Sequence, residues 1–290
     1  MEDSFKPQID IKEQDTVCML APSFVAEFDY PEVIYRLRKL GFKHIVELTF
    51  GAKMTNLAYY ALLKDSLQKN EKKTWIASPC PTLVNLIRSK YPHLIENLVP
   101  VHSPLGCMAL ICDKIYPDCK KVFVGPCVTK KLESKELGNV DDAWTFKELD
   151  QLFKSENIPE KIGEPEYCFT FDKFYNDYTK IYPVSGGLST TLNYSHILKK
   201  KDILVTDGLK NVIPVLDDFK DGMYKEYKFL DILSCEGGCI NGPGMIGDRS
   251  VKDRRKRIVK YMNYAQRYEK DLGRTGLKVE AEGIDFERKF

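Results

Sequence analysis

The stretch LSCEGGCINGPG, from Leu233 to Gly244, places Cys235 and Cys239 four positions apart among four glycines and a proline. The chain has 290 residues and nine cysteines, which are too few for a disulfide scaffold and leave one thiol over in a fully paired set. In a reducing compartment such thiols serve packing, metal binding or catalysis. The four histidines show no metal-ligand spacing, so all-thiolate ligation is the metal chemistry that remains.

Two further loops carry a cysteine next to proline. ASPCPTLV at residues 77–84 contains Cys80, and VGPCVTKK at residues 124–131 contains Cys127. Proline fixes φ and lacks a competing N–H, while glycine lets backbone amides approach a bound group. Taken alone, each loop is more typical of a turn with a buried cysteine than of a ligand loop. Together they predict that four thiolates converge, which suits a 4Fe–4S cubane.

The hydrophobic pattern predicts an α/β fold with a mostly parallel sheet, because strand, loop and helix alternate along the chain. Strand-type segments are expected at residues 16–22, 44–48, 73–81, 120–127 and 202–208. Helices are expected at residues 31–40, 53–69, 83–91, 104–116, 129–137, 145–158 and 250–270. Thr145 is the expected N-cap of its helix. Ligands of such folds bind at the carboxyl ends of strands, and the loops after Leu20, Ser78 and Val124 lie there.

Charge and hydropathy exclude several classes of partner. The net charge is +2, from 44 basic and 42 acidic residues, so no overall field attracts nucleic acid or an anionic membrane. The acidic, polar start does not resemble a signal peptide, and no apolar run reaches the roughly 20 residues that span a bilayer. We expect a cytoplasmic protein with one domain over residues 16–270, between polar tails at 1–15 and 271–290.

The three cysteine motifs, in this order and preceded by LAPSFVAEF and LGFKHIVELTFGA, resemble the catalytic H-cluster domain of iron-only hydrogenases over roughly residues 16–265. The resemblance implies two lobes with mostly parallel sheets flanked by helices, and a metal centre between the lobes. It also implies an enzyme that interconverts protons, electrons and dihydrogen. The external partners implied are a ferredoxin-like electron carrier and the proteins that assemble the di-iron unit.

By motif position, the resemblance makes Cys80, Cys127, Cys235 and Cys239 the ligands of a 4Fe–4S cubane. Cys239 would also bridge to a di-iron unit that carries carbonyl, cyanide and a dithiolate. The residues implied to surround that unit are Ala21, Pro22, Ser23, Lys130, Ser185, Gly186 and Gly187. An ammonium group and hydroxyl or amide donors suit an anionic cyanide in a dry pocket. Lys130 is therefore expected to act beside Cys239 in catalysis.

The sequence departs from the family where active members transfer protons. Pro79 stands where a second cysteine begins the usual relay, and its later positions fall on Ala58, Leu62 and Val99. None of these side chains exchanges protons, so turnover is expected to be slow. The pocket residues Gly125, Leu233 and Leu105 also differ from the family pattern. Two alternatives therefore stay open: a hydrogen or redox sensor with a signalling partner, and a cluster-carrying protein of iron–sulfur assembly.

Other candidates have a structural and a functional interpretation. Cys107, Cys112 and Cys119 are expected to be small buried residues rather than ligands of an extra cluster, as are Cys18 and Cys168. A surrogate acid near Pro79 has three candidates, which are Glu47, Lys53 and His102. The basic run at residues 254–257 is either a solvated helix face or a docking surface for an acidic electron carrier.

Overall fold

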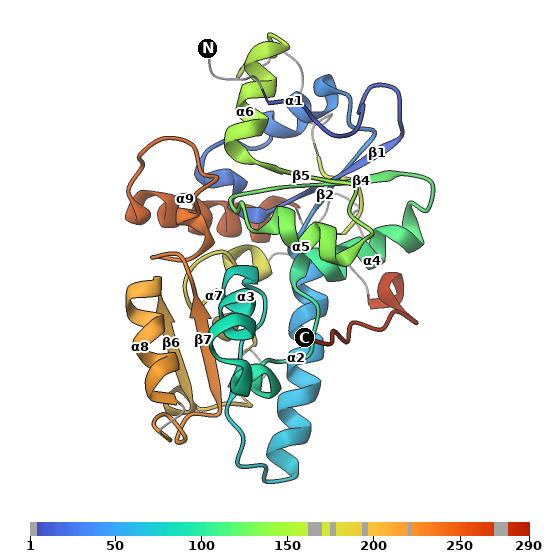
Figure 1. Cartoon of the computed structure of the whole chain (residues 1–290). Coiled ribbons are helices and arrows are strands. Elements are labelled where there is room, and N and C mark those ends of the chain that lie inside the picture. The colour runs from blue at the N-terminus through green and yellow to red at the C-terminus, as the bar shows by residue number, and fades with distance from the viewer. Residues whose placement is uncertain (1–4, 162–169, 175–177, 193–196, 220–221, 270–277) are drawn as a thin grey trace.

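The computed structural model describes the chain except residues 1–4, 162–169, 175–177, 193–196, 220–221 and 270–277. It has two lobes, each built on a parallel sheet (Figure 1). The larger sheet has the strand order β2-β1-β4-β5 and the smaller one the order β3-β7-β6. This arrangement confirms the α/β class and the two-lobed architecture. None of the described helices is long and apolar enough to cross a membrane.

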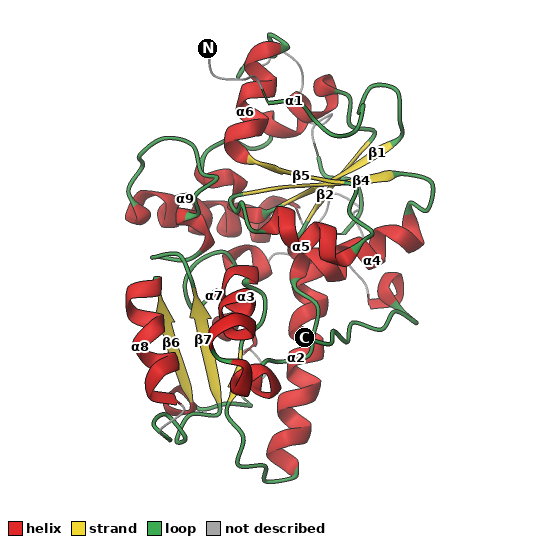
Figure 2. Cartoon of the chain, viewed as in Figure 1, coloured by secondary structure: helices red, strands yellow, loops and turns green. Residues whose placement is uncertain are grey.

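The larger sheet forms because four short apolar runs pair in parallel. Its strands are β1 (Thr16–Leu20), β2 (His44–Glu47), β4 (Lys120–Gly125) and β5 (Asp142–Thr145). Every residue of the central strand β1 is buried, as expected for a parallel sheet covered on both faces. Helices α1 (Glu32–Leu40) and α6 (Phe146–Ser155) cover one face, and α4 (Pro104–Ile115) and α5 (Lys130–Leu137) the other (Figure 2).

The smaller sheet consists of β3 (Trp75–Ile76), β7 (Phe229–Leu233) and β6 (Ile203–Asp207). Alternate residues of β7 point to opposite faces. Leu230 packs with α3 (Pro81–Lys90) and α8 (Leu209–Phe219), while Phe229 packs with α2 (Thr49–Gln68) and α7 (Gly187–Leu192). Both faces of this sheet are therefore covered as well.

Two helices join the lobes. Phe50 near the start of α2 lies in the core of the larger lobe, and Tyr59 further along lies in the core of the smaller one. Helix α9 (Val251–Tyr264) runs on into a π-helical turn, Ala265–Glu269, and crosses beside both lobes (Figure 1). Ile258 and Tyr261 of α9 are buried, whereas Tyr264 is 40% exposed and is not a core residue.

Several expectations are confirmed in detail and others are not. Thr145 is the N-cap of α6, where its Oγ1 accepts from the N–H of Glu148 at 3.2 Å and Glu148 accepts from the N–H of Thr145 at 2.7 Å. The strands β5 and β7 were not predicted. Helix α2 begins at Thr49, four residues before its predicted start.

Residues 278–290 pack against the rest of the fold. Helix η9 (Lys278–Ala281) is followed by a segment that contacts both lobes, since Phe286 packs on the core of the larger lobe and Phe290 on that of the smaller one. The N–H of His102 donates to the carbonyl of Phe286 at 2.9 Å. Arg288 is buried and pairs with Glu133 at 2.8 Å. At the other end, the N–H of Gln8 donates to Asp142 at 2.7 Å. The expected polar tails thus contact the core, and the domain boundaries stay a prediction.

Candidate metal centre

The cysteine loops all follow strands, at the carboxyl ends of the two sheets. Cys127 lies two residues beyond β4 of the larger sheet, and Cys235 two residues beyond β7 of the smaller sheet. Cys80 follows β3 and is the N-cap residue of α3. Cys239 begins the short helix η7 (Cys239–Asn241). The predicted position at strand ends is confirmed, and the two sheets contribute to one centre.

All four of these cysteines line one cavity of about 60 Å³, called here the cysteine cavity. Its other walls are mostly apolar, including Pro79, Leu188 and Leu233. The structure therefore brings together the four thiols that the sequence singled out. None of the eight described cysteines is in a disulfide.

The donor set fits a cluster better than a single ion. Burial raises the pKa of the Cys239 thiol, and Cys80, Cys127 and Cys235 raise it further because a second thiolate nearby would repel the first. Four thiolates in an apolar cavity need positive charge to be stable, which iron supplies. Within the part of the chain that the structure describes, no three Cys, His, Asp or Glu side chains are placed to hold one metal ion. In a cubane each thiolate binds a different iron, so the four sulfurs need not surround a single metal ion.

Hydroxyl groups connect the cysteine loops. Ser234 Oγ lies 3.3 Å from the sulfur of Cys80 and 3.8 Å from that of Cys235. Two residues beyond Cys80 and Cys127, the hydroxyls of Thr82 and Thr129 are 2.9 Å apart. The contact of Thr82 with Thr129 crosses between the lobes, whereas the contact of Ser234 with Cys80 joins two loops of the smaller sheet.

The glycines of the third loop allow close packing between backbones. Gly238 has φ +96°, and a Cβ there would lie 2.6 Å from the carbonyl oxygen of Pro183. A Cβ on Gly242 would lie 2.4 Å from the carbonyl oxygen of Pro126, in the loop that carries Cys127. We predicted that glycine lets amides approach a bound group. The structure shows a further reason, since the loop is pressed against both lobes.

A second cavity of about 80 Å³ adjoins the first, and Ala21, Pro22 and Ser23 form part of its wall. It is called here the Ala-Pro-Ser cavity. The two cavities share Pro79, Cys127, Lys130, Tyr182 and Cys239 as wall residues. The hydroxyl of Ser23 is buried and has no hydrogen-bond partner. Most buried polar atoms in proteins have one.

Phe123 explains one departure from the family pattern. Residues 123 and 125 of β4 point to the same face, and Phe123 lines the Ala-Pro-Ser cavity. Its ring lies so close to Gly125 that a Cβ there would be 2.3 Å from the ring carbon Cζ. The space beside Gly125 is therefore filled by a neighbouring side chain. Leu105 lines the same cavity.

Lys130 lies on the wall of both cavities, and its expected role beside a di-iron unit stays a prediction. Its ammonium group donates to Ser103 Oγ at 3.0 Å and to the carbonyl of Pro79 at 3.3 Å, and it pairs with the buried carboxylate of Glu133. An ammonium has three N–H groups, so these three partners occupy them all. A ligand in the cavity would have to take the place of one of them.

The glycine loop at residues 185–187 lies beside the centre and is not part of either wall. The N–H of Ser185 donates to the carbonyl of Gly237 at 3.1 Å, in the cysteine loop. Its neighbours Tyr182 and Pro183 line the Ala-Pro-Ser cavity instead. The sequence analysis did not identify Tyr182, although it is an aromatic residue only three positions before this loop. Ser234 was missed as well.

The positions expected for a proton relay carry apolar side chains that also lie in an apolar environment. Ala58, Leu62 and Val99 belong to one hydrophobic cluster of the smaller lobe, and Val99 is fully buried. The surrogate acids that we considered line neither cavity. Glu47 pairs with the fully buried Lys180. Lys53 lies 5.7 Å from the ring centre of Phe50.

His102 is the third surrogate, and burial lowers its pKa. The other thiols behave as small core residues: burial raises the pKa of Cys18, Cys107, Cys112 and Cys119, and all four are buried. Cys168 lies outside the described residues.

The geometry defines an α/β protein in which four cysteines from two parallel sheets line one buried cavity. The model of the family described as iron only hydrogenase large subunit, C-terminal domain, matches residues 14–243, and the chain belongs to this family. Iron–sulfur cluster binding fits that membership. The recognition made from the motifs is confirmed.

Relatives with different functions resemble the chain. Iron hydrogenase 1 of Clostridium pasteurianum is 26% identical, over 83% of this chain and 52% of that protein. The cytosolic Fe-S cluster assembly factor NAR1 of Kluyveromyces lactis is 21% identical, over 78% of this chain and 63% of that protein. The chain thus spans about half to two thirds of the length of these relatives.

Solved structures show the same fold. An FeFe-hydrogenase, HydA(deltaEFG), matches with a TM-score of 0.67 and 18% identity, over 98% of this chain and 96% of that one. HydA1 from Chlamydomonas reinhardtii matches with a TM-score of 0.65 and 17% identity, over 93% of each chain.

Proposed function

We propose that the chain binds a 4Fe–4S cluster through Cys80, Cys127, Cys235 and Cys239 and works as a redox protein. The observation that carries this proposal is that all four thiols line one apolar cavity at the carboxyl ends of two sheets. When bound, the cluster supplies one-electron oxidation and reduction. The apolar walls exclude water, and the hydroxyl of Ser234 lies within hydrogen-bonding distance of the sulfurs of Cys80 and Cys235.

Anaerobic reconstitution with iron and sulfide tests the proposal. We expect about four irons per chain, and loss of most of them in Cys127→Ala, because the cubane takes four thiolate ligands. Cys112→Ala is the matched control, since Cys112 is a buried free thiol that lines neither cavity. Equal iron content in Cys127→Ala and the wild-type protein would refute the ligand assignment.

A second candidate function is that of a slow hydrogenase with a di-iron unit in the Ala-Pro-Ser cavity. It is favoured by that cavity itself, which shares Cys239 with the cysteine cavity and has in its wall Ser23, whose buried hydroxyl lacks a hydrogen-bond partner. Against fast turnover, Pro79 and the apolar residues Ala58, Leu62 and Val99 occupy the positions expected for the relay. Bands of carbonyl and cyanide in the infrared spectrum, together with hydrogen production from a chemical reductant, would establish this function. A cubane without those bands would support the first proposal and contradict the second.

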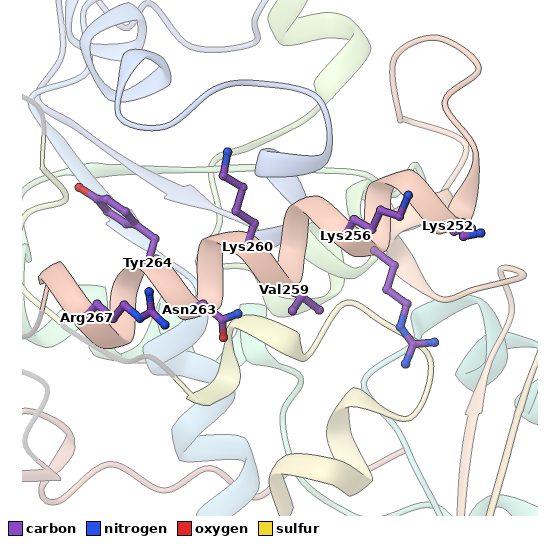
Figure 3. A pocket seen from close by; sticks show the side chains of 8 residues that line it. Lys252, Lys256, Val259, Lys260, Asn263, Tyr264 and Arg267 are labelled. Carbon is purple, nitrogen blue, oxygen red and sulfur yellow. The ribbon is translucent and has the colours of Figure 1, made fainter.

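The partner of either function is an acidic electron carrier of the ferredoxin type. Helix α9 and the π-helical turn after it present exposed cations along a groove of about 720 Å³ (Figure 3), which are Lys252, Arg255, Lys256, Lys260 and Arg267. On this face Lys256 pairs with Asp253 at 3.4 Å, and both side chains are exposed. The face is therefore strongly positive and attracts an acidic surface.

Helix α9 also contacts the cysteine loop directly. The guanidinium of Arg254 donates to the side chain of Asn241 at 3.0 Å, in the helix that begins at Cys239. A Cβ on Gly237 would meet Val251, the first residue of α9, at 2.3 Å. A carrier docked on the exposed face of α9 would thus lie one helix away from the centre.

A further inference from the structure

Tyr182 occupies a position shared by both cavities. It follows the short helix η4 (Tyr178–Ile181), and its N–H donates to the carbonyl of Thr179 at 3.0 Å. A Cβ on Gly187 would lie 2.9 Å from the Cα of Tyr182, so the glycine loop packs tightly against its backbone. Tyr182 lines the cysteine cavity and the Ala-Pro-Ser cavity, together with Cys127 and Cys239. Its position is therefore fixed by the backbone on both sides.

The phenol oxygen of Tyr182 is buried and has no hydrogen-bond partner. Leaving a buried hydroxyl unsatisfied costs roughly 1–3 kcal/mol. Tyr59, another buried phenol of the same apolar cluster, shows the usual arrangement: its Oη lies 2.7 Å from Ser78 Oγ and accepts from the N–H of Ser78 at 2.8 Å. Tyr182 lacks such an acceptor from the protein, and it lies against cavities that would hold a ligand.

The chemistry of the occupant supplies the missing acceptor. Burial raises the pKa of Tyr182 well above its usual value of 10.0, so the hydroxyl keeps its proton and acts as a donor. Sulfide and iron-bound thiolate sulfurs accept hydrogen bonds. A donor to such a sulfur stabilises the reduced cluster, which carries one more negative charge, and so raises its reduction potential.

We propose that the Tyr182 hydroxyl donates a hydrogen bond to a sulfur of the cluster held by the four cysteines and raises the reduction potential of that cluster. The inference rests on the proposed cluster binding. Tyr182 is thus a tuning residue of the centre, added to the four ligands. Water in the cavities is the competing partner for this hydroxyl, and the experiment separates the two.

The test compares Tyr182→Phe with Tyr59→Phe, each of which removes one buried hydroxyl and keeps the aromatic ring. After reconstitution, we expect Tyr182→Phe to keep its iron, to shift its midpoint potential to a lower value in a redox titration, and to lose an exchangeable-proton coupling in the electron–nuclear double resonance spectrum. Tyr59→Phe should leave both readouts unchanged. An unshifted potential and an unchanged coupling in iron-loaded Tyr182→Phe would overturn the inference and would point to water.

A second measurement needs no cluster. In the iron-free protein, Tyr182→Phe removes an unsatisfied hydroxyl, so the urea midpoint should stay level or rise. Tyr59→Phe breaks two hydrogen bonds, so its midpoint should fall. A fall of the same size in iron-free Tyr182→Phe would show that the hydroxyl has a protein partner and would overturn the inference. A wild-type chain that holds no iron would instead refute the proposed function, and this inference with it.

Discussion

Arg288 donates to the carboxylate of Glu133 at 2.8 Å, although the two residues are 155 positions apart. Both side chains are almost fully buried, with 6% and 1% exposed. Glu133 also pairs with Lys130, the lysine on the wall of both cavities. The C-terminal segment is thereby joined to the candidate metal centre through one buried carboxylate.

Arg288→Ala should destabilise the protein by about 3 kcal/mol, because removal of one partner leaves a buried charge less compensated. Urea unfolding at neutral pH measures the change. Lys256→Ala is the control, since its pair with Asp253 is exposed and should contribute about 0–1 kcal/mol. Equal midpoints for Arg288→Ala and Lys256→Ala would show that the buried pair adds nothing to stability.

The same pair predicts a pH dependence. Burial acts to raise the pKa of Glu133, but the charges of Lys130 and Arg288 and hydrogen bonds to the carboxylate outweigh it and lower the pKa below 4.5. A lowered pKa in the folded state stabilises the fold above 4.5, and this contribution is lost as the pH falls through the folded-state value. The difference in unfolding free energy between the wild-type protein and Arg288→Ala should therefore shrink below pH 4.5. A difference that grows there would contradict the assignment.

Phe123 and Gly125 make a second testable pair. Gly125→Met should destabilise by about 1–3 kcal/mol, because the new side chain would meet the ring of Phe123. Phe123→Ala alone should cost about 3–5 kcal/mol through the cavity that it leaves. The double variant should be less destabilised than the sum of the two, since the methionine then has room. Additive costs would mean that the two side chains do not compete for this space.

The sequence was most informative where function depends on local signals. Proline and glycine beside Cys80, Cys127 and Cys239 mark turns, and the three motifs together predicted that the cysteines converge. Thr145 with Glu148 forms a capping box within four residues. These features were predicted because the physical cause lies in adjacent positions.

Other features depend on contacts between distant segments. Strand β7 was missed because Asp231 interrupts its apolar run, and the structure satisfies this buried carboxylate with the N–H of Ser189 at 2.9 Å. Strand β5 begins at Asp142, whose carboxylate accepts from the indole of Trp144 at 2.8 Å. The pairing of Arg288 with Glu133 likewise has no local signature.

The basic face of α9 predicts an effect on electron transfer. Replacing Lys252 and Lys256 by glutamate should slow reduction by an acidic ferredoxin about tenfold at low ionic strength, because attraction between the surfaces speeds their encounter. Stopped-flow reduction at increasing salt measures it, and the difference should vanish as salt screens the charges. Lys72→Glu, an exposed charge beyond α2, is the control. Equal rates for the α9 variant and this control would place the docking surface elsewhere.

Pro79→Cys is the last test, and it concerns the missing proton relay. The new thiol would lie on the wall shared by both cavities, but a relay needs further groups that exchange protons. The hydroxyl of the adjacent residue Ser78 donates to the carbonyl of Val99 at 2.7 Å and is hydrogen-bonded to Tyr59. Burial raises the pKa of Tyr59, so this phenol does not release its proton.

Beyond these groups the path is apolar, because Ala58 and Leu62 pack in the same cluster as Val99. We therefore expect hydrogen production by reconstituted Pro79→Cys to stay within about twofold of the wild-type rate, which is less than the 10²–10⁴-fold gain of a working acid–base group. Pro79→Ala, which opens the same space without a thiol, is the matched control. A gain of a hundredfold in Pro79→Cys alone would show that protons reach this wall by a route that avoids Ala58, Leu62 and Val99.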